Sequence, residues 1–411
     1  MGGASPRAAV VGAGLGGLLA AAFLAREYRV DVFERLPHIG GRFYNLPYRG
    51  YQLTTGALHM VPYGPTGPLA RMLRASGTDV DIVKSVPDAM VRLKGEDAPF
   101  REMQRRFPLS KRLKMFPLPW RIRHPRGSVA DMFGHDPYLV GIADSFFGWS
   151  CSVTADELPA SEWMAFLDNI RRFGTPGVPR GGCSAVCDAL RDAVEARGGR
   201  VHTSSAVDAI LTRDGSAVGV KVGGRAVKAG LVFSDVGHRL TAGLLDRPPS
   251  GYGEGDAYNR PSAGIKLSLG SHRGLFDHGG VLLTPHTRRV NGLCQPTNTD
   301  PGLAPRGRHL TMAHQTVRGG DLRREIELGL QDLRDLFPDA DYEVLAVQCY
   351  SGDWPVNRMA SGRDPGPATP VRGLWVVGDG AKGRGGVEVE GVALGVAEAL
   401  RGAGLEHGAG L

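Results

Sequence analysis

The glycine-rich segment at residues 12–17 constrains the fold more than any other part of this chain. It follows a run of alanine and valine at residues 8–11, which predicts a buried parallel strand. An alanine- and leucine-rich stretch at residues 18–27 predicts a helix after it. A second strand is expected at residues 30–34, where it ends in the acid Glu34. Strand, glycine turn, helix, strand and acid in this register are typical of a dinucleotide-binding βαβ unit.

The glycines of this turn have separate physical roles. Gly12 permits the tight turn, and Gly14 lets the backbone approach a diphosphate whose charge lies at the start of the helix. Gly17 allows the helix to pack closely against the strand. Glu34 is expected to accept hydrogen bonds from the ribose hydroxyls. This end of the chain is therefore predicted to bind a nucleotide cofactor.

The other end of the chain carries a second glycine-rich unit. Residues 373–377 predict a strand, which runs directly into Gly378-Asp379-Gly380. A helix punctuated by glycine then opens within residues 385–395 and is expected to end near Leu400. An acid and backbone donors at this point can hold a second part of a large dinucleotide. The two ends of the chain are therefore expected to meet on one cofactor.

Together these segments resemble a known family. The motifs Glu34…Gly40-Gly41-Arg42, Gly378-Asp379 and Glu390-Gly391-Val392 resemble the phytoene-desaturase branch of the flavin amine-oxidase superfamily. Residues 50–57 are similar to the second flavin-contacting segment of that family, and residues 179–182 to its P-x-G-G turn. Residues 198–202 with Val207 resemble the strand pair that reaches the adenine. The likeness covers roughly half of the chain, scattered from end to end.

The resemblance implies FAD as the cofactor and assigns roles to individual residues. Glu34 would bind the ribose, Arg42 and Asp379 would hold the diphosphate and ribityl region, and Gly391 with Val392 would approach the isoalloxazine ring. The residues expected to bind FAD are Gly12, Gly14, Leu15, Gly16, Gly17, Glu34, Arg35, Gly41, Arg42, Thr55, Gly56, Ala57, Val207, Gly378, Asp379, Glu390, Gly391 and Val392. No metal site is expected, because the sequence carries no recognisable metal-ligand motif.

Two departures from the family pattern bear on the substrate. Carotenoid desaturases of this family carry D-x-G-P-T where this chain has Thr54-Thr55-Gly56-Ala57-Leu58, and the chain is shorter than they are. A second G-x-G-x-x-G in a βαβ unit is missing, so no dedicated NAD(P)H site is expected. The electron partner is then expected to be oxygen, a quinone, another small acceptor or a protein.

The predicted fold class is α/β: a Rossmann-type FAD-binding domain with a discontinuous α+β substrate domain, in which helices flank a mixed sheet. The FAD-binding domain is expected to comprise residues 1–70, 178–259 and 350–411. The substrate domain is expected to comprise residues 71–177 and 260–349, where helical stretches and aromatics are more frequent. Those aromatics are expected either to pack as core or to line an apolar tunnel.

Residues 101–126 form a local basic stretch with nine lysines and arginines against one acid, Glu102. The whole chain carries +7, so the remainder is close to neutral, and no nucleic-acid partner is expected. Leu109, Leu113 and Phe116 share one helical face of this stretch. Three interpretations remain open: a solvated basic flank over a stripe that faces the core, a peripheral contact with an anionic membrane, or a site for an anionic substrate group.

The five scattered cysteines predict free thiols in a reducing compartment. Cys183 and Cys187, four residues apart, are expected to be core thiols. The apolar run near the N-terminus is interrupted by glycines and is expected to be a buried strand rather than a signal peptide. We therefore expect a cytoplasmic protein, with the membrane interpretation placing it on the inner membrane surface.

The expected function is oxidation or reduction at a C–C bond of an apolar isoprenoid or carotenoid-like substrate, by hydride transfer at flavin N5. Desaturation, saturation and isomerisation all agree with the resemblance. Candidates for catalytic proton transfer are His59, Glu388 and Lys382, and Tyr63 and Trp354 are candidates for stacking on the flavin. One alternative is an FAD-dependent amine or amino-acid oxidase. The other is a non-catalytic prenyl-lipid carrier of the Rab GDP-dissociation-inhibitor type.

Overall fold

Strand β1 (Arg7–Val11) lies at the centre of a five-stranded parallel sheet. The computed structural model describes residues 6–254, 262–350, 365–406 and 408–411. The strand order is β19-β13-β1-β2-β9, and every neighbouring pair is parallel. The other strands are β2 (Arg29–Phe33), β9 (Arg200–His202), β13 (Leu231–Ser234) and β19 (Leu374–Val376). Both ends of the chain therefore contribute strands to one sheet, and the predicted Rossmann-type fold class is confirmed.

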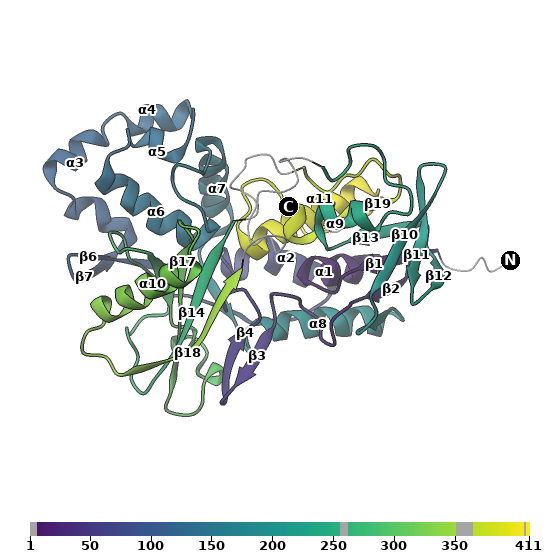
Figure 1. The fold of residues 1–411 in the computed structure, drawn as a ribbon, viewed down its shortest axis with the longest axis horizontal. Coiled ribbons are helices and arrows are strands. Elements are labelled where there is room, and N and C mark those ends of the chain that lie inside the picture. Colours follow the sequence, from purple (N-terminus) through teal and green to yellow (C-terminus); the bar gives the residue numbers. More distant parts are fainter. Residues whose placement is uncertain (1–5, 255–261, 351–364, 407) are drawn as a thin grey trace.

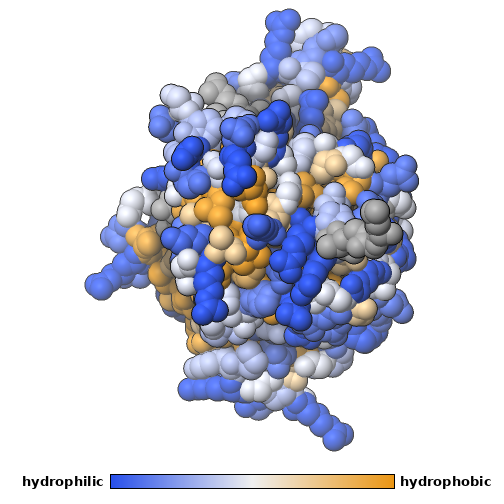
Figure 2. Space-filling model, turned by 90° about the vertical axis from the view of Figure 1, so that its right-hand side faces the viewer, coloured by the Kyte–Doolittle hydropathy of each residue, from blue (hydrophilic) through white to orange (hydrophobic). Residues whose placement is uncertain are grey.

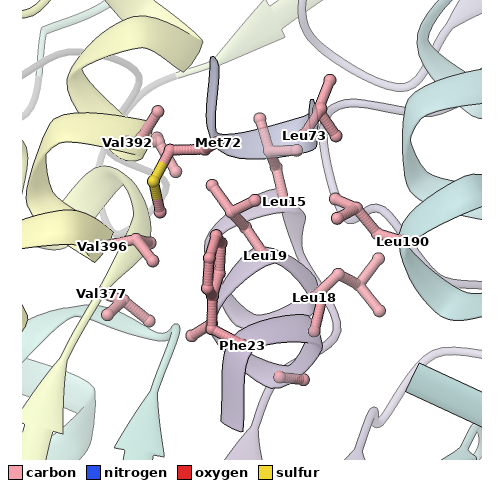
Figure 3. Close-up of a cluster of buried hydrophobic side chains, with 14 of the residues drawn as sticks. Leu15, Leu18, Leu19, Phe23, Met72, Leu73, Leu190, Val377, Val392 and Val396 are labelled. Atoms are coloured by element: carbon pink, nitrogen blue, oxygen red, sulfur yellow. The ribbon is translucent and has the colours of Figure 1, made fainter. Parts of the chain in front are cut away.

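Helices cover one face of this sheet, and a small antiparallel sheet covers the other (Figure 1). Helix α1 follows the glycine turn, and all ten of its residues are buried. In Figure 3 its Leu15 lies near Met72 and Leu73 of α2, and its Phe23 faces Val377 and Val396. The helices are α1 (Leu15–Leu24), α2 (Pro68–Ser76), α8 (Cys183–Ala196) and α11 (Glu388–Gly402). The opposite layer consists of β10 (Val207–Arg213), β11 (Ser216–Val222) and β12 (Arg225–Lys228), together with helix α9 (Gly237–Leu244).

Helix α2 crosses the boundary that the sequence suggests at residue 70. Its Leu69, Met72 and Leu73 are buried in the same core as α1 and α11, so the whole helix belongs with the parallel sheet. On α8, Cys183 and Cys187 are buried free thiols in this core, as predicted.

A seven-stranded mixed sheet organises the second lobe. Its order is β18-β14-β17-β16-β15-β6-β7, and only the β15–β6 pair is parallel. Its strands are β6 (Ala89–Leu93), β7 (Glu96–Pro99), β14 (Gly264–Ser271), β15 (Val281–Leu283), β16 (Val290–Cys294), β17 (His309–Thr316) and β18 (Tyr342–Tyr350). Helix α10 (Leu322–Leu336) packs on one face, and α6 (Pro137–Cys151) packs on the other.

The remaining elements connect or extend the two lobes. Aromatic side chains of α6 and α7, among them Phe147, Phe166 and Phe173, are buried against one another and form a core rather than the wall of the cofactor cavity described below. The other strands are the hairpin β3 (Asn45–Tyr48) and β4 (Tyr51–Thr54), and the pair β5 (Ile82–Lys84) and β8 (Gly177–Pro179). The other helices are α3 (Leu109–Lys114), α4 (Leu118–Arg123), α5 (Val129–Met132) and α7 (Ala160–Phe173).

Helices α3 and α4 correct one interpretation of the basic stretch. The fractional exposure is 71% for Leu109, 65% for Leu113, 87% for Phe116 and 66% for Trp120, and no residue of either helix is buried. The prediction that this stripe faces the core is therefore wrong. A helical period shows which residues share a face, but it does not show whether that face is buried or exposed to solvent. Within the described ranges, no helix has the length and hydropathy needed to span a bilayer.

These two helices lie at the end of the molecule opposite the β10–β12 sheet (Figure 1). Figure 2 faces the β10–β12 end, which is largely covered by hydrophilic side chains around an apolar patch near its centre. The apolar side chains of α3 and α4 are thus far from the nucleotide-binding sheet.

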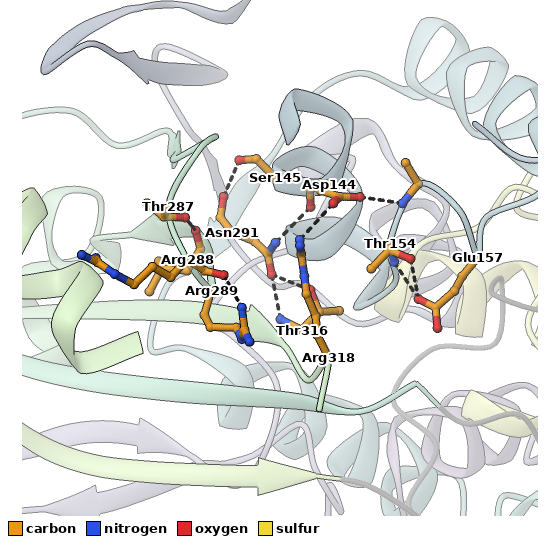
Figure 4. Close-up of polar contacts among 12 residues, drawn as sticks. Asp144, Ser145, Thr154, Glu157, Thr287, Arg288, Arg289, Asn291, Thr316 and Arg318 are labelled. Atoms are coloured by element: carbon orange, nitrogen blue, oxygen red, sulfur yellow. Dashed lines mark hydrogen bonds and ion pairs between the residues drawn. The ribbon is translucent and has the colours of Figure 1, made fainter. Parts of the chain in front are cut away.

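A buried polar network joins α6 to the seven-stranded sheet (Figure 4). The Asn291 side chain donates to the carbonyl of Asp144 at 3.0 Å and accepts from the backbone N–H and hydroxyl of Thr316 at 2.7 and 2.8 Å. Ser145 donates to the carbonyl of Asn291, and Arg318 pairs with the Asp144 carboxylate at 3.0 Å. Asn291 therefore satisfies buried polar groups on both elements at once.

Replacing this amide tests how the lobe is held together. We expect Asn291→Ala to lower the free energy of unfolding by about 2–4 kcal/mol, because buried groups lose their partners and a cavity is left. Urea unfolding measures the change. Glu327→Ala on the exposed side of α10 is the control, with a change within about 0.5 kcal/mol. Equal stability of Asn291→Ala and the control would contradict this role.

Candidate cofactor and active site

A cavity of about 950 Å³ runs between the two lobes. At one end it is lined by the glycine turn before α1 and by Glu34, which follows β2. At the other end it is lined by Ser152, His314 and Tyr350, the last two from strands of the seven-stranded sheet. Its walls therefore come from segments that are hundreds of residues apart in sequence.

The glycine turn is held by contacts with the end of β2 and with the start of α1. Gly12 has φ +96°, a conformation that glycine adopts without strain, and its N–H donates to the carbonyl of Phe33. A Cβ at Gly17 would lie 2.1 Å from the carbonyl oxygen of Gly12. The helix start consequently packs directly against the turn, which is the geometry expected of a diphosphate cradle.

Glu34 fixes this cradle from the second strand. Its carboxylate accepts hydrogen bonds from the N–H of Ala13 at 2.8 Å and from the N–H of Leu36 at 2.9 Å. Because Glu34 also lines the cavity, it remains close enough to contact a ribose there.

Arg42, Asp379 and Lys382 form one chain of charges. Asp379 pairs with Arg42 through one carboxylate oxygen and with Lys382 through the other, the latter at 2.6 Å. Arg42 and Asp379 line the cavity, but the ammonium of Lys382 is buried outside its lining. Lys382 therefore positions Asp379, and the geometry gives it no direct access to a substrate.

His59 holds the backbone and does not face the cavity. It is fully buried, with Nε2 at 2.7 Å from the carbonyl of Gln52 and Nδ1 accepting from the N–H of Cys183 at the start of α8. Burial lowers its pKa to about 4, so the ring is neutral at pH 7. Both nitrogens are already engaged, and the expectation of a catalytic His59 is not supported by this geometry.

Glu388 is the one predicted proton-transfer candidate that lines the cavity. It opens α11 with φ +46°, an uncommon conformation for a glutamate. Burial, opposed by Lys382 and reinforced by Asp379, raises the pKa of its carboxyl to about 7. A carboxyl that is partly protonated near neutral pH can either accept or donate a proton.

Glu390 and Tyr63 do not line the cavity, and their hydrogen bonds connect neighbouring elements. The fully buried Glu390 carboxylate accepts from the N–H of Tyr63 at 2.9 Å and of Leu69 at 2.8 Å. The Tyr63 hydroxyl donates to the carbonyl of Gly385, and its ring packs on Phe173. Glu390 thus ties α11 to the start of α2, whereas Trp354 lies outside the described residues.

The predicted cofactor residues divide into two groups. Those that line the cavity are Gly12, Gly14, Leu15, Gly16, Glu34, Arg35, Gly41, Arg42, Gly56, Ala57, Val207, Gly378, Asp379 and Val392. Those that lie behind the lining are Gly17, Thr55, Glu390 and Gly391. For Glu390 this departs from the expected direct contact, because its carboxylate is used by backbone N–H groups of other elements.

The lining also includes residues that the sequence analysis did not assign to the site, among them Ser152, Asp235, His314 and Tyr350. The Ser152 hydroxyl lies 3.2 Å from His314 Nε2, and the His314 ring stacks on Tyr350. Burial lowers the pKa of His314 to about 4, so this ring is neutral. Gly264, between them in the sheet, leaves the necessary space, because a Cβ there would lie 2.7 Å from His314 Nε2. No local motif marks these residues: strand pairing brings His314 and Tyr350 together, and Ser152 reaches His314 from the end of α6.

Lys266 fixes the loop that carries Gly56 and Ala57. Its fully buried ammonium donates to the Thr54 hydroxyl, to the Thr54 carbonyl at 3.2 Å and to the Ala57 carbonyl at 3.0 Å. Burial lowers its pKa to about 7. A strand of the second lobe thereby holds a cavity-lining loop of the first. Across the described ranges, no three His, Cys, Asp or Glu side chains are grouped to hold a metal ion.

Comparisons with known proteins agree with this architecture. Residues 10–76 match the family model of the NAD(P)-binding Rossmann-like domain. An uncharacterised protein from Methanocaldococcus jannaschii is 40% identical over 399 residues, which is 95% of this chain and 97% of that protein. A phytoene desaturase (neurosporene-forming) from Rhodobacter capsulatus is 28% identical over 291 residues, covering 59% of this chain and 55% of its own.

Two solved structures extend the comparison. The crystal structure of an oxidoreductase from Methanosarcina mazei has a TM-score of 0.91 and 44% identity, and the match covers 96% of this chain and all of that one. Putrescine oxidase shares the fold, with a TM-score of 0.74 and 16% identity over 97% of this chain and 99% of its own. The sequence-based prediction of the family is confirmed: this chain is an oxidoreductase and belongs to the phytoene desaturase-like branch of the flavin amine-oxidase superfamily.

Proposed function

We propose that the protein is an FAD-dependent oxidoreductase that acts on a C–C bond of an apolar isoprenoid or carotenoid-like substrate. The observation that carries this proposal is the cavity that is lined both by the glycine turn with Glu34 and by Val392 with Glu388. Its charged groups are concentrated where a nucleotide would lie. The phytoene desaturase from Rhodobacter capsulatus supports the substrate class.

The residues present fit FAD. A Cβ would fill the cradle at Gly16, where it would lie 2.6 Å from Gly378, so bare backbone faces the space expected for a diphosphate. Glu34 supplies ribose acceptors, and Arg42 supplies a cation beside the same cavity. Gly56, Ala57 and Val392 would lie against the ring system.

When bound, FAD supplies hydride acceptance or donation at N5. The chain's own residues would orient the substrate and exclude water: Leu58, Val389 and Val392 present apolar side chains to the cavity. Glu388 is the residue we propose to move a proton, since its carboxyl lines the cavity and has a pKa of about 7. Lys382 and Arg42 would act by holding Asp379 in place.

An amine or amino-acid oxidase is the second candidate. The polar side chains of Ser152 and His314 in the cavity favour it, because a polar substrate could hydrogen-bond to them and a pure hydrocarbon could not. A prenyl-lipid carrier without redox chemistry is the third candidate.

Anaerobic bleaching of the flavin distinguishes the three candidates. An isoprenoid that bleaches the flavin supports the first proposal, and an amine that bleaches it supports the second. Purification without flavin would favour the carrier.

The cofactor assignment predicts the effect of two substitutions. Arg42→Ala and Glu34→Gln should each raise the Kd for FAD roughly 10- to 100-fold, because each removes hydrogen bonds of a charged group. Quenching of flavin fluorescence on titration into the apoprotein measures this. Arg49→Ala, on the exposed β3–β4 hairpin, is the matched control and should leave the Kd unchanged. An unchanged Kd in both site variants would argue against this FAD site.

The raised pKa of the Glu388 carboxyl makes stability depend on pH. Its pKa is raised from about 4.5 to about 7, so folding is penalised by its ionisation as the pH rises through this window. We therefore expect the difference in the free energy of unfolding between Glu388→Gln and the wild type to grow in favour of the variant as the pH rises from about 4.5 to about 7. The growth should be at most about 1.4 kcal/mol per pH unit, and the difference should stay constant above this window. Urea unfolding at pH 4.5, 6 and 8 measures the difference. Glu398→Gln, exposed on the same helix, is the control, and a pH-independent difference for Glu388→Gln would refute the expectation.

We also propose that α3 and α4 make a peripheral contact with an anionic membrane. Leu109, Leu113, Phe116 and Trp120 are exposed, and their burial in the interfacial region would be favourable. Lys111 and Lys114 are paired with Asp136. Among the described residues, Arg105, Arg112, Arg123 and Arg126 have no acidic partner and remain available for lipid phosphates. Such a contact would give an apolar substrate a route from the bilayer.

Flotation with vesicles tests this surface. The wild type should float with phosphatidylglycerol/phosphatidylcholine vesicles at low salt, and less at high salt because the charges are screened. Phe116→Ser with Trp120→Ser should reduce binding at least about tenfold, since each aromatic contributes about 1.5–3 kcal/mol on burial. Leu46→Ser, an exposed apolar residue on β3 outside the cavity lining, is the control. Failure of the wild type to float would remove the proposal.

A further inference from the structure

Asp235 occupies the centre of the diphosphate cradle. It follows directly after β13, and its backbone N–H donates to the carbonyl of Val11 at the end of β1. Its carboxyl oxygen Oδ2 accepts from the N–H of Gly17 at 2.9 Å, in the first turn of α1. An acidic side chain therefore uses one of the N–H groups that make the start of such a helix attractive to anions.

The surrounding glycines approach this carboxyl so closely that none of them could carry a side chain. A Cβ at Gly14 would lie 2.4 Å from Oδ2 of Asp235. A Cβ at Gly16 would lie 2.8 Å from Oδ1, and one at Gly378 would lie 1.7 Å from it. Three glycines from the two ends of the chain thus enclose one carboxyl group, which also lines the cavity.

The two carboxyl oxygens differ in their contacts. Oδ2 is held by Gly17, whereas Oδ1 accepts no hydrogen bond from any other residue in the described part of the chain. Oδ1 lies between Gly16 and Gly378, on the side where the predicted diphosphate contacts converge. A protonated carboxyl can keep its bond from Gly17 at Oδ2 and donate from Oδ1, but an ionised one can only accept.

The charges around Asp235 favour the neutral form. Burial raises the pKa of its carboxyl well above the usual range, and the nearby acids Asp379 and Glu34 reinforce this. The N–H of Gly17 and the cation of Arg42 oppose it. The titratable or charged groups that face it from the neighbouring elements are Cys187 on α8, Glu34 after β2, Arg42, Asp379 and, in the same cavity, Arg239 on α9.

We propose that Asp235 is a cofactor-binding residue that holds the FAD diphosphate as a neutral carboxyl donor, so that FAD binding is coupled to the uptake of one proton. This inference rests on the proposed FAD site. A diphosphate and an ionised Asp235 would place like charges in one enclosure, which is strongly unfavourable. The proton is taken from solvent, and it adds to the Asp235 carboxylate without breaking any other bond. Binding of FAD therefore weakens as the pH rises above the pKa of Asp235.

Titration of the apoprotein with FAD between pH 6 and pH 9.5 tests the coupling. The Kd of the wild type should rise with pH, up to about tenfold per pH unit, which is the limit for one coupled proton. Asp235→Asn keeps the size of the side chain and an N–H donor but cannot ionise. Its Kd should be independent of pH and lower than that of the wild type at pH 9.5. Asp246→Asn, exposed and outside the cavity, should follow the wild type.

Calorimetry of the wild type in two buffers of different ionisation enthalpy keeps the test independent of the variant's folding. Uptake of about one proton per FAD at high pH supports the proposal. A Kd that does not change with pH, absence of proton uptake, or an Asp235→Asn variant with the slope of the wild type would overturn it. Wild-type protein that binds no FAD at any pH would instead overturn the proposed cofactor, and the role of Asp235 with it.

Discussion

The close approach of two backbones at Gly16 and Gly378 is the constraint on which the rest of the site depends. A side chain on Gly16 would lie 2.6 Å from Gly378, so the start of α1 and the turn after β19 can meet only as bare backbone. This contact joins the two ends of the chain, and β13 is inserted between β1 and β19 beneath it. Asp235, at the end of β13, is enclosed by the same contact. The cavity is thus a consequence of strand order as much as of any motif.

The parts of this architecture that depend on local spacing could be predicted from the sequence. The glycine turn, Glu34 and the Gly378-Asp379 pair carry their own signature, because each needs a particular backbone conformation beside a strand end. The family and the fold class followed from them. Arg42 and Asp379 were expected near one cofactor, and the structure pairs them with each other.

Other parts could not be predicted, because they depend on pairing between distant strands or on what a surface meets. Ser152 and His314 converge only through the packing of α6 on the sheet. Glu390 carries a family motif, yet its carboxylate satisfies backbone N–H groups of other elements. The apolar residues of α3 recur with a helical period, which is equally compatible with a buried and an exposed face. In the structure this face is exposed. Periodicity fixes a face, and only tertiary contacts decide its environment.

The strand order of the parallel sheet has a consequence for biosynthesis. Strand β1 precedes β13 and β19 in the sequence, but it becomes central only when β13 is paired on one side, and the sheet gains its far edge with β19 (Leu374–Val376). During translation, the apolar surface of α1 that packs on α11 can be covered only after most of the chain has been synthesised. The nascent protein therefore has a long interval in which this surface is uncovered, and the nucleotide site can be completed only after residues of α11 have left the ribosome.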